Sequence, residues 1–468
     1  MQTVIERLAG IAGSVRASAL PPEVLRAAAD RLLDGLGCML AGSREPTVRT
    51  VHTALAAPHG PATLFGGTDR AGLADATLAN TTALRYHDFM DGHPGPYPCH
   101  PSMTLPAVLA VAEAVGASGA EVLRAVALTY ELDIRLQIGA GDPDITAHGW
   151  SGSTNVGLAV PFGIGGLFGL TADRLADAIA IATVHSPALD ASGRGAMAPS
   201  KAVVDGMVAA SAVTATLLAR GGLGGKRAAF EGDDGYVAAL ARGWNEDVVL
   251  APLDRFRILD VYTKLYNTVK CGQTAVSAAL RLRDRLLDRW GDLGRIRSIT
   301  VTLAERDRRN QLQDEEARRR PPNRDTANHS AVFCVAAALV AGDLQAAQFS
   351  PESLVDPRTL ALVDRTTLGS DERYTAFWPG ANPAGVRIEL EDGTVLEDEE
   401  LYSPGHPRNP LTAEQLRGKF RAQVEPVLGP DRTTDLIAAV DDVADLPDLT
   451  ELIALCRPAA EMEMEFTA

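Results

Sequence analysis

One short segment of the chain gathers the side-chain types that move protons. Residues 85–106 read RYHDFMDGHPGPYPCHPSMTLP, and their carboxylates and imidazoles are those of Asp88, Asp91, His87, His93 and His100. Carboxylates and imidazoles can accept and return protons near neutral pH. The segment opens onto an apolar helical stretch, and titratable groups in a loop are free of packing duties. This loop is therefore the first candidate for an active site.

Other interpretations of the same loop stay open. Asp88 and Asp91 are three residues apart, so one helical turn would place them on one face, where they could instead cap or solvate a helix end. His100 precedes Pro101, a residue typical of the first helical turn. A metal site is a third interpretation, because His and Asp are common ligands, but no HExxH pair supports it. We expect neither a metal nor another cofactor.

Composition narrows the classes of partner. At 468 residues the chain is long enough for two or three domains, and 46% hydrophobic with 22% charged residues is an ordinary globular balance. A net charge of −16 argues against nucleic acid and anionic membranes, which both reward clusters of Lys and Arg. If the substrate is an acid, a few local cations must hold it against that field. Individual lysines therefore become informative.

The cysteines and the apolar runs indicate a cytoplasmic protein. The thiols are odd in number, form no CxxC pair, and lack the spacing of an iron–sulfur cluster: Cys38, Cys99, Cys271, Cys334 and Cys456. The N-terminus carries charge where a signal peptide needs an apolar core. The longest apolar runs, 157–170 and 331–341, are broken by glycine or shorter than the ~20 residues that span a bilayer. We expect a soluble chain with no membrane partner.

The periodicity predicts a mainly α fold with a smaller α+β domain. Apolar residues recur at helical spacing through most of residues 4–241 and again through 411–455. Between them, 297–303 alternates like a strand and 385–399 carries Asp392-Gly393 between two alternating runs, a hairpin signal. Helices are expected at 274–290 and 330–340, and fraying after Arg457. The predicted domains are a helical domain, 1–265, an α+β lid domain, 266–404, and a segment that completes the helical domain, 405–468.

Two lysines stand in surroundings that lysines usually avoid. Lys201 begins a helix, KAVVDGMVAASA, whose other residues are almost all small or apolar. Such a lysine either snorkels from a helix end or projects into a cavity. Lys264 lies between Tyr262 and Tyr266 near the predicted domain junction, and clefts between domains are preferred ligand sites. A surface position is the alternative for each.

Taken together, these segments resemble the MmgE/PrpD family, which includes 2-methylcitrate dehydratase and cis-aconitate decarboxylase. The resemblance covers most of the chain, and it depends on the order and spacing of the motifs rather than on any one of them. The matching segments are LLDGLGCMLAG (32–42), RYHDFMD with HPS (100–102), GLFGL (166–170), K(x)₄GMVAA (201–210), GLGGKRAAFEG (222–232), KLYNTVKCGQTAV (264–276), NRDTANHSAVFCVAAAL (323–339) and GHPRNPLT (405–412).

The resemblance implies a fold, an assembly and a chemistry. It implies a helical domain with a smaller lid domain, usually as a homodimer, and a cluster-free enzyme that removes a proton beside a carboxylate and then expels water or carbon dioxide. Asp88, His100, Lys201 and Lys264 match active-site positions of decarboxylase-like members. Proton removal there creates an aci-carboxylate that needs nearby cations, which both lysines would supply, while His100 oriented by Asp88 would move the proton.

The chain departs from the family at two places. Many relatives have a histidine where this chain has Ser151, although His148 stands close by, and many have another after the Lys264 motif, where this chain reads 270-KCGQ-273. Loss of imidazoles alters proton delivery and carboxylate binding, so the substrate need not be methylcitrate or cis-aconitate. The resemblance gives the expected substrate-binding residues as Asp91, His148, Ser151, Lys270 and Gln273.

The leading hypothesis is a cofactor-independent lyase, a hydro-lyase of a small hydroxy di- or tricarboxylic acid. A decarboxylase, or an isomerase or epimerase of a related acid in a biosynthetic pathway, is the alternative on the same scaffold. A relative that has lost catalysis and binds a metabolite is the alternative from another class.

Overall fold

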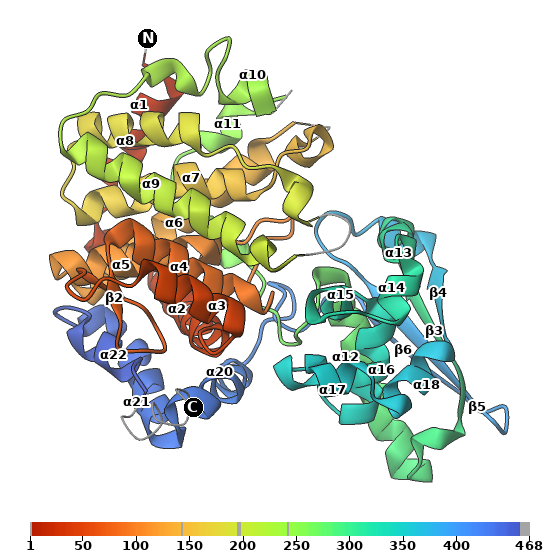
Figure 1. Ribbon diagram of the computed structural model, residues 1–468. Helices are drawn as coiled ribbons and strands as arrows, with labels where there is room; N and C mark the ends of the chain where they lie inside the picture. The colour runs from red at the N-terminus through yellow and green to blue at the C-terminus, as the bar shows by residue number, and fades with distance from the viewer. Residues whose placement is uncertain (1, 142–143, 194–197, 241–242, 459–468) are drawn as a thin grey trace. The chain divides into compact units, whose positions relative to one another are not determined.

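A computed structural model describes residues 2–141, 144–193, 198–240 and 243–458 (Figure 1). The described chain divides into two compact units. One contains the described residues up to 193, those of 198–261 and those from 413 onward, and the other contains residues 262–412. The C-terminal segment thus returns to the helical unit, as its periodicity predicted. The tail predicted to fray after Arg457 includes 459–468, which lie outside the described residues.

The first unit is built of helices, and local sequence signals set their ends. Thr3 with Glu6 and Ser118 with Glu121 form capping boxes at two helix starts, and Gly116 ends a helix in the left-handed conformation. The longer helices are α1 (Val4–Ser14), α2 (Pro22–Gly42), α3 (Pro46–Leu55), α4 (Leu73–Tyr86), α5 (Leu105–Val115), α6 (Gly119–Gly139), α7 (Ser153–Leu167), α8 (Ala172–His185), α9 (Val204–Arg220), α20 (Ala413–Leu428), α21 (Pro430–Asp441) and α22 (Thr450–Leu455). Short helical segments between them include η2 (Pro101–Thr104), η3 (Ile145–His148), η5 (Pro199–Val203), α10 (Tyr236–Leu240) and α11 (Glu246–Val249).

The core of this unit joins segments that are far apart in sequence. Helix α6 is buried along most of its length and packs against α7. Helix α7 also packs against α9, and α9 packs against α4. Helices α2 and α20 lie side by side, although nearly the whole chain separates them (Figure 1). At Gly37 a Cβ atom would lie 2.9 Å from the Gln423 side-chain oxygen and 3.0 Å from the Phe420 ring. Glycine at this position allows the close approach of α20.

Two features of this unit differ from the prediction. Ala62–Thr63 (β1) and Arg70–Ala71 (β2) pair as a two-residue antiparallel ladder inside the stretch predicted as helical, and each strand is too short to show a period of two. Separately, residues Lys201–Arg220 form a continuous helical segment long and apolar enough, by length and composition alone, to cross a bilayer. Most of that apolar window is buried inside the fold. Its composition is that of a core helix.

The second unit contains a mixed sheet with helices on one face. The strand order is β4 (Thr366–Ser370), β3 (Ile296–Leu303), β5 (Ala384–Leu390) and β6 (Val395–Glu400), with β3 and β4 parallel and the other pairs antiparallel. Helices α12 (Lys270–Trp290) and α16 (Ala331–Ala341) share an apolar core with the inward residues of the strands (Figure 1). Shorter helices complete the unit: α13 (Glu305–Leu312), α14 (Glu315–Arg319), α15 (Arg324–Asn328), α17 (Pro351–Leu354), α18 (Pro357–Asp364) and α19 (Glu372–Thr375).

The predicted strand and hairpin are present in this sheet. Gly393 has φ +82°, and the Asp392 carboxylate accepts the Thr394 amide at 2.9 Å, so the turn chemistry follows the sequence signal. Burial alternates along β5, which puts one face against the helices. Strand β4 was not predicted from the sequence. Its pairing with β3 is parallel and requires the long helical crossover, so no local pattern announces it.

Candidate active site

The site begins at the turn that ends α4. His87 is still in the right-handed helical region, but Asp88 has φ +50°. Residues other than glycine rarely adopt this left-handed conformation, which costs of order 1–3 kcal/mol unless the surroundings compensate, although Asp tolerates it better than most. The reversal also breaks the helical turn that would have placed Asp88 and Asp91 on one face. That interpretation of their spacing is wrong, and the two carboxylates have different partners.

Asp88 lies in a buried group of alternating charges. Its carboxylate oxygens are 3.0 Å from the Arg85 guanidinium and 3.4 Å from Lys201 Nζ, and Arg85 Nε is 3.3 Å from the carboxylate of Asp205 on α9. All four side chains are at most 12% exposed. We call Arg85, Asp88, Lys201 and Asp205 the Asp88 cluster. The contact of Lys201 with Asp88 is the longest in this cluster, so it is the one a substrate carboxylate would displace most easily.

Two serines extend the cluster to a second predicted position. The Ser153 hydroxyl donates to Asp205 Oδ1 at 2.7 Å, and the hydroxyls of Ser151 and Ser153 are 3.0 Å apart. The Ser151 hydroxyl also accepts a hydrogen bond from the amide of Ser153, the first residue of α7, at 3.2 Å. The structure therefore brings Ser151 together with Asp88 and Lys201, through residues that the sequence analysis did not select.

His100 is oriented by the loop backbone. Its Nδ1 donates to the carbonyl oxygen of Asp91 at 2.7 Å, and the additional orientation by Asp88 stays a prediction. A ring held at Nδ1 by a carbonyl presents its other nitrogen as an acceptor, the form a general base needs. His100 is half-buried and lies at the start of η2.

Asp91, which is predicted to contact the substrate, has protein partners at both carboxylate oxygens. Its side chain is fully buried, with Oδ1 accepting the Ser102 amide at 3.3 Å and Oδ2 accepting the Tyr130 hydroxyl at 2.8 Å. Burial raises the pKa of this carboxyl. The backbone carbonyl of Asp91 also orients His100, and a substrate contact of the Asp91 side chain stays a prediction.

The remaining histidines of the loop point to other partners. His87 Nε2 is 2.8 Å from the Glu45 carboxylate, and His93 Nδ1 is 2.5 Å from the side-chain oxygen of Gln137. Among the residues that the structure describes, no group of three or more His, Cys, Asp or Glu side chains is arranged to hold a metal ion. The three imidazoles are therefore separate groups rather than one ligand set.

His148 lies three residues before Ser151. It ends η3, and its Nε2 is buried without a hydrogen-bond partner in the described part of the chain. A buried ring nitrogen without a partner costs free energy unless a ligand or water completes it. This favours the predicted substrate-binding role, since the nitrogen has capacity for one more hydrogen bond.

A further carboxyl is buried behind the loop. Asp133 on α6 is 1% exposed, its Oδ2 accepts the Cys99 thiol at 3.2 Å, and its Oδ1 has no hydrogen-bond partner among the described residues. Burial raises the pKa of Asp133 to about 7, and the carboxylates of Asp205 and Asp91 add to the rise. This carboxyl therefore titrates near neutrality, within electrostatic range of Asp205 and Asp91.

In the second unit, Lys264 lies in a segment held by Gln273. Lys264 is 2% exposed. The Gln273 oxygen accepts the amides of Leu265 and Tyr266 at 3.2 and 3.1 Å, and its nitrogen donates to the carbonyls of Tyr266 and Thr268 at 2.6 and 2.9 Å. The amide of Gln273 is thereby saturated. Gln273 therefore shapes the segment that carries Lys264, and its predicted substrate contact stays a prediction.

Lys270 keeps the properties of a binding residue. Its Nζ donates to the Pro379 carbonyl at 3.0 Å and lies 5.6 Å from the centre of the Trp378 ring. Burial lowers the pKa of Lys270 to about 8, an effect that Asp307 partly offsets. Its ammonium therefore titrates just above neutrality.

Three residues of the first-unit site were not predicted from the sequence. Arg85, Asp205 and Ser153 lie inside or beside segments from which other site residues were predicted, and each had a usable signal. Arg85 precedes Asp88 by three residues, and Asp205 is the one acid in the apolar helix that follows Lys201. An acid on such a helix requires a buried partner, which is the argument that could have found it.

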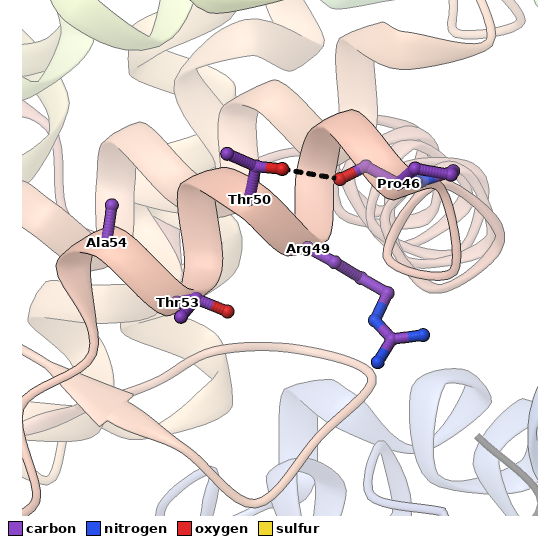
Figure 2. A pocket seen from close by; sticks show the side chains of 5 residues that line it. All are labelled: Pro46, Arg49, Thr50, Thr53 and Ala54. Atoms are coloured by element: carbon purple, nitrogen blue, oxygen red, sulfur yellow. Dashed lines mark hydrogen bonds between the residues drawn. The ribbon is translucent and has the colours of Figure 1, made fainter. Parts of the chain in front are cut away.

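A surface pocket elsewhere on this unit does not involve these residues. It is open and lies along α3, lined by Pro46, Arg49, Thr50, Thr53 and Ala54, as Figure 2 shows. The Thr50 hydroxyl donates to the Pro46 carbonyl at 2.9 Å. No predicted site residue lines this pocket, so it adds nothing to the candidate active site.

Comparisons with known proteins agree with the resemblance over almost the full length. The sequence model of the MmgE/PrpD N-terminal domain matches residues 6–248, and that of the MmgE/PrpD C-terminal domain matches residues 266–445. A cis-aconitate decarboxylase of Aspergillus terreus is 26% identical over 461 residues, covering 93% of this chain and 92% of the relative. The cis-aconitate decarboxylase of Mus musculus is 25% identical over 480 residues, with 98% and 94% covered. The mitochondrial 2-methylcitrate dehydratase of Yarrowia lipolytica is 26% identical over 452 residues, with 88% and 84% covered.

Proposed function

Since the chain belongs to the MmgE/PrpD family, we propose that it is a cofactor-independent lyase that removes a proton beside a carboxylate of a small hydroxy di- or tricarboxylic acid and expels water. Relatives named as dehydratases and as decarboxylases of such acids support the lyase class. The observation that carries the proposal is the Asp88 cluster, in which a carboxylate in the left-handed conformation contacts a half-buried lysine.

The chemistry fits the types of the clustered residues. Breaking the C–H bond beside a carboxylate leaves an electron pair that delocalises into that carboxylate, and the added charge needs a preorganised cation. Lys201 supplies that cation, and the substrate carboxylate would replace Asp88 as its partner. In a dehydration the electron pair then forms the C=C bond while the C–O bond breaks, and the departing hydroxide takes up a proton to leave as water.

The proposed roles follow from position and from the resemblance. Asp88, His100 and Lys201 are the catalytic residues of the first unit, with His100 transferring the proton. Lys264 joins the catalytic set on the strength of the family resemblance. His148, Ser151 and Lys270 are the proposed substrate-binding residues, and the hydroxyl of Ser151 suits a substrate hydroxyl as well as a carboxylate.

A decarboxylase is the second candidate, because two of the three relatives described above carry that activity in their names and are matched over more of their length than the dehydratase. In that reaction the C–C bond to carbon dioxide breaks, and the resulting carbanion takes a proton. The same lysine would stabilise the same developing charge, so the Asp88 cluster does not discriminate between the two.

The test is proton NMR of the purified protein with a panel of hydroxy, unsaturated and methyl-substituted di- and tricarboxylic acids, with products identified by mass. Loss of 18 mass units from a panel acid supports the dehydratase, by the mass of water, and loss of 44 supports the decarboxylase, by the mass of carbon dioxide. A rearranged acid of unchanged mass would favour the isomerase alternative. Thermal stabilisation by acids without turnover of any of them would contradict the lyase and favour a binding protein. Full activity after chelation is expected.

The finer expectations from the sequence stay proposals. We propose a homodimer, testable by light scattering of the purified chain, and a cytoplasmic location, although one relative is named as mitochondrial. We also propose that the functional domains divide at 265/266 and 404/405. Limited proteolysis followed by mass analysis of the fragments tests those boundaries.

A further inference from the structure

A fully buried lysine reaches the same loop from the C-terminal segment of the chain. Lys419 lies on α20 among residues of its core face, such as Leu416, Phe420 and Gln423. Its side chain is 1% exposed, although lysine is rarely buried without a specific partner. The burial of Lys419 therefore calls for an account of what its ammonium group holds.

The ammonium group of Lys419 has three well-defined neighbours. Nζ lies 2.5 Å from Asp34 Oδ1 on α2, donates to the carbonyl oxygen of Phe89 at 2.9 Å, and lies 4.1 Å from the centre of the Phe89 ring. A cation at that distance over an aromatic face is attracted by the ring. Two of the three contacts are thus with Phe89, which is 330 residues away in sequence and directly follows Asp88.

We propose that Lys419 is a positioning residue that holds Asp88 in its left-handed conformation, and the proposal rests on the function proposed above. Asp88 is anchored through its carboxylate by Arg85 and Lys201, and the next residue, Phe89, is anchored at its carbonyl oxygen by Lys419. A residue at φ +50° persists when its surroundings fix it on both sides. Without the anchor at Phe89, the turn can relax toward a commoner conformation, and the Asp88 carboxylate moves away from Lys201.

Stability alone is a weak reason for such a pair. A buried ion pair pays a desolvation cost that its attraction repays only in part, and apolar replacements of similar shape often fold equally well. The Asp34 carboxylate uses one oxygen for Lys419, while Oδ2 has no hydrogen-bond partner among the described residues. The pair therefore leaves one buried carboxylate oxygen without a hydrogen bond, whereas Lys419 does bond to the Phe89 carbonyl. This agrees with a role of the lysine in fixing Phe89.

The test is a double substitution that removes both charges at nearly constant volume, Lys419→Met with Asp34→Asn. We expect the double variant to fold, kcat to fall at least tenfold, and KM to change less than threefold, because Lys201 still binds the substrate while Asp88 is misplaced. The matched control is Arg417→Met with Asp441→Asn. That pair joins the same helix to α21 at 2.7 Å, is about half exposed, and should leave both constants unchanged.

Hydrogen exchange of the peptides covering residues 85–93, followed by mass spectrometry, provides a readout independent of turnover. Faster exchange confined to this loop in the double variant supports the anchor, even if the natural protein turns over no panel acid, a result that would defeat the proposed function alone. A folded double variant with unchanged kcat and unchanged loop exchange would overturn the proposal. If this variant does not fold, Lys419→Gln with Asp34→Asn, whose amides can bond to each other, serves the same comparison.

Discussion

Two lysine–aspartate pairs flank the turn at the end of α4, and they differ in nearly every physical respect. Lys201 and Asp88 are 3.4 Å apart with side chains 11% and 6% exposed, while Lys419 and Asp34 are 2.5 Å apart at 1% each. The first pair belongs to a larger cluster with a second cation and a second carboxylate. The second pair is enclosed in the core and contacts the backbone of the turn.

The difference distinguishes a lysine that can exchange its aspartate for a substrate carboxylate from a lysine that can only fix the structure around it. A longer contact near the surface can exchange its partner for a substrate carboxylate, because the displaced charge remains partly solvated. A fully buried contact cannot exchange without leaving an uncompensated charge in the core. Asp88 is therefore contacted by the exchangeable pair and Phe89 by the fixed pair. The left-handed conformation of Asp88 lies in the turn between them.

The largest expected effect is on turnover, from Lys201→Ala. We expect a fall in kcat/KM of about a hundredfold to a thousandfold, because the cation that faces the developing charge is gone. Folding should be unchanged, since the lysine lies near the surface and circular dichroism can verify this. Steady-state kinetics provide the measurement. The control is Lys226→Ala, because Lys226 is an exposed lysine outside the candidate site. Wild-type kinetics would remove the cation argument.

The opposite pair should respond in stability first. Lys419→Met alone leaves Asp34 charged and buried, and breaking a buried pair at one partner costs about 3–5 kcal/mol. We expect a clear drop in the melting temperature, in contrast with Lys201→Ala. Adding Asp34→Asn should recover part of it. Equal melting temperatures for the wild type and the single variant would show that the buried pair is not fixed as described.

Asp133 sharpens the comparison, because the described residues include no ion-pair partner for its carboxyl. Burial raises its pKa to about 7, so the folded protein binds this proton more tightly than the unfolded chain. The stabilisation is complete below the unfolded pKa near 4 and is lost as the pH rises toward 7. The loss is on the order of a few kcal/mol.

Asp133→Asn removes that titration. As the pH rises from 4 to 7, we expect the melting temperature of the variant to rise relative to that of the wild type. Above pH 8 the difference between the two melting temperatures should stay constant. Thermal unfolding in a series of buffers makes the measurement, with Asp435→Asn, an exposed carboxyl on α21, as the control for lost charge. Parallel curves for Asp133→Asn and wild type would refute the assignment.

The smallest effect is expected at the rear of the Asp88 cluster. Asp205→Asn keeps a hydrogen bond to Ser153 but removes the charge opposite Arg85, so Arg85 should pull harder on Asp88. We expect about a tenfold loss of kcat, the scale of a modest misplacement of a reacting group. Ser153→Ala should cost less, because the ion pair remains. A larger loss in Ser153→Ala than in Asp205→Asn would reverse this ordering.

The helices and the hairpin could be predicted because their signals are local. Capping residues, apolar spacing and Asp392-Gly393 act within a few residues, whereas the parallel partner of β3 is set by a crossover of more than sixty residues. The site divides in the same way. Asp88 and Lys201 were each predicted from their surroundings, but their contact spans 113 residues and depends on how α4 and η5 pack.

Other parts of the site depend on the three-dimensional fold and have little or no signal in the sequence alone. The left-handed backbone at Asp88 separated it from Asp91, and no sequence pattern requires an aspartate to adopt that conformation. Gln273 matched a family motif, which cannot distinguish a ligand contact from a backbone one. Lys419 had a weak signal, a lysine at core spacing between Leu416 and Phe420, that becomes meaningful only when Phe89 is known to face it.

The most direct test of the central claim is exchange of substrate protons in deuterated water, compared between wild type and Asp88→Asn with the acid that the panel identifies. The claim is that the Asp88 cluster holds Lys201 where its cation stabilises the charge that develops when His100 removes the proton. We predict deuterium beside a carboxylate with the wild type and at least a hundredfold slower incorporation with the folded variant. Incorporation by Asp88→Asn at the wild-type rate would contradict the account, because the proton would then be removed without the residue around which the site is built.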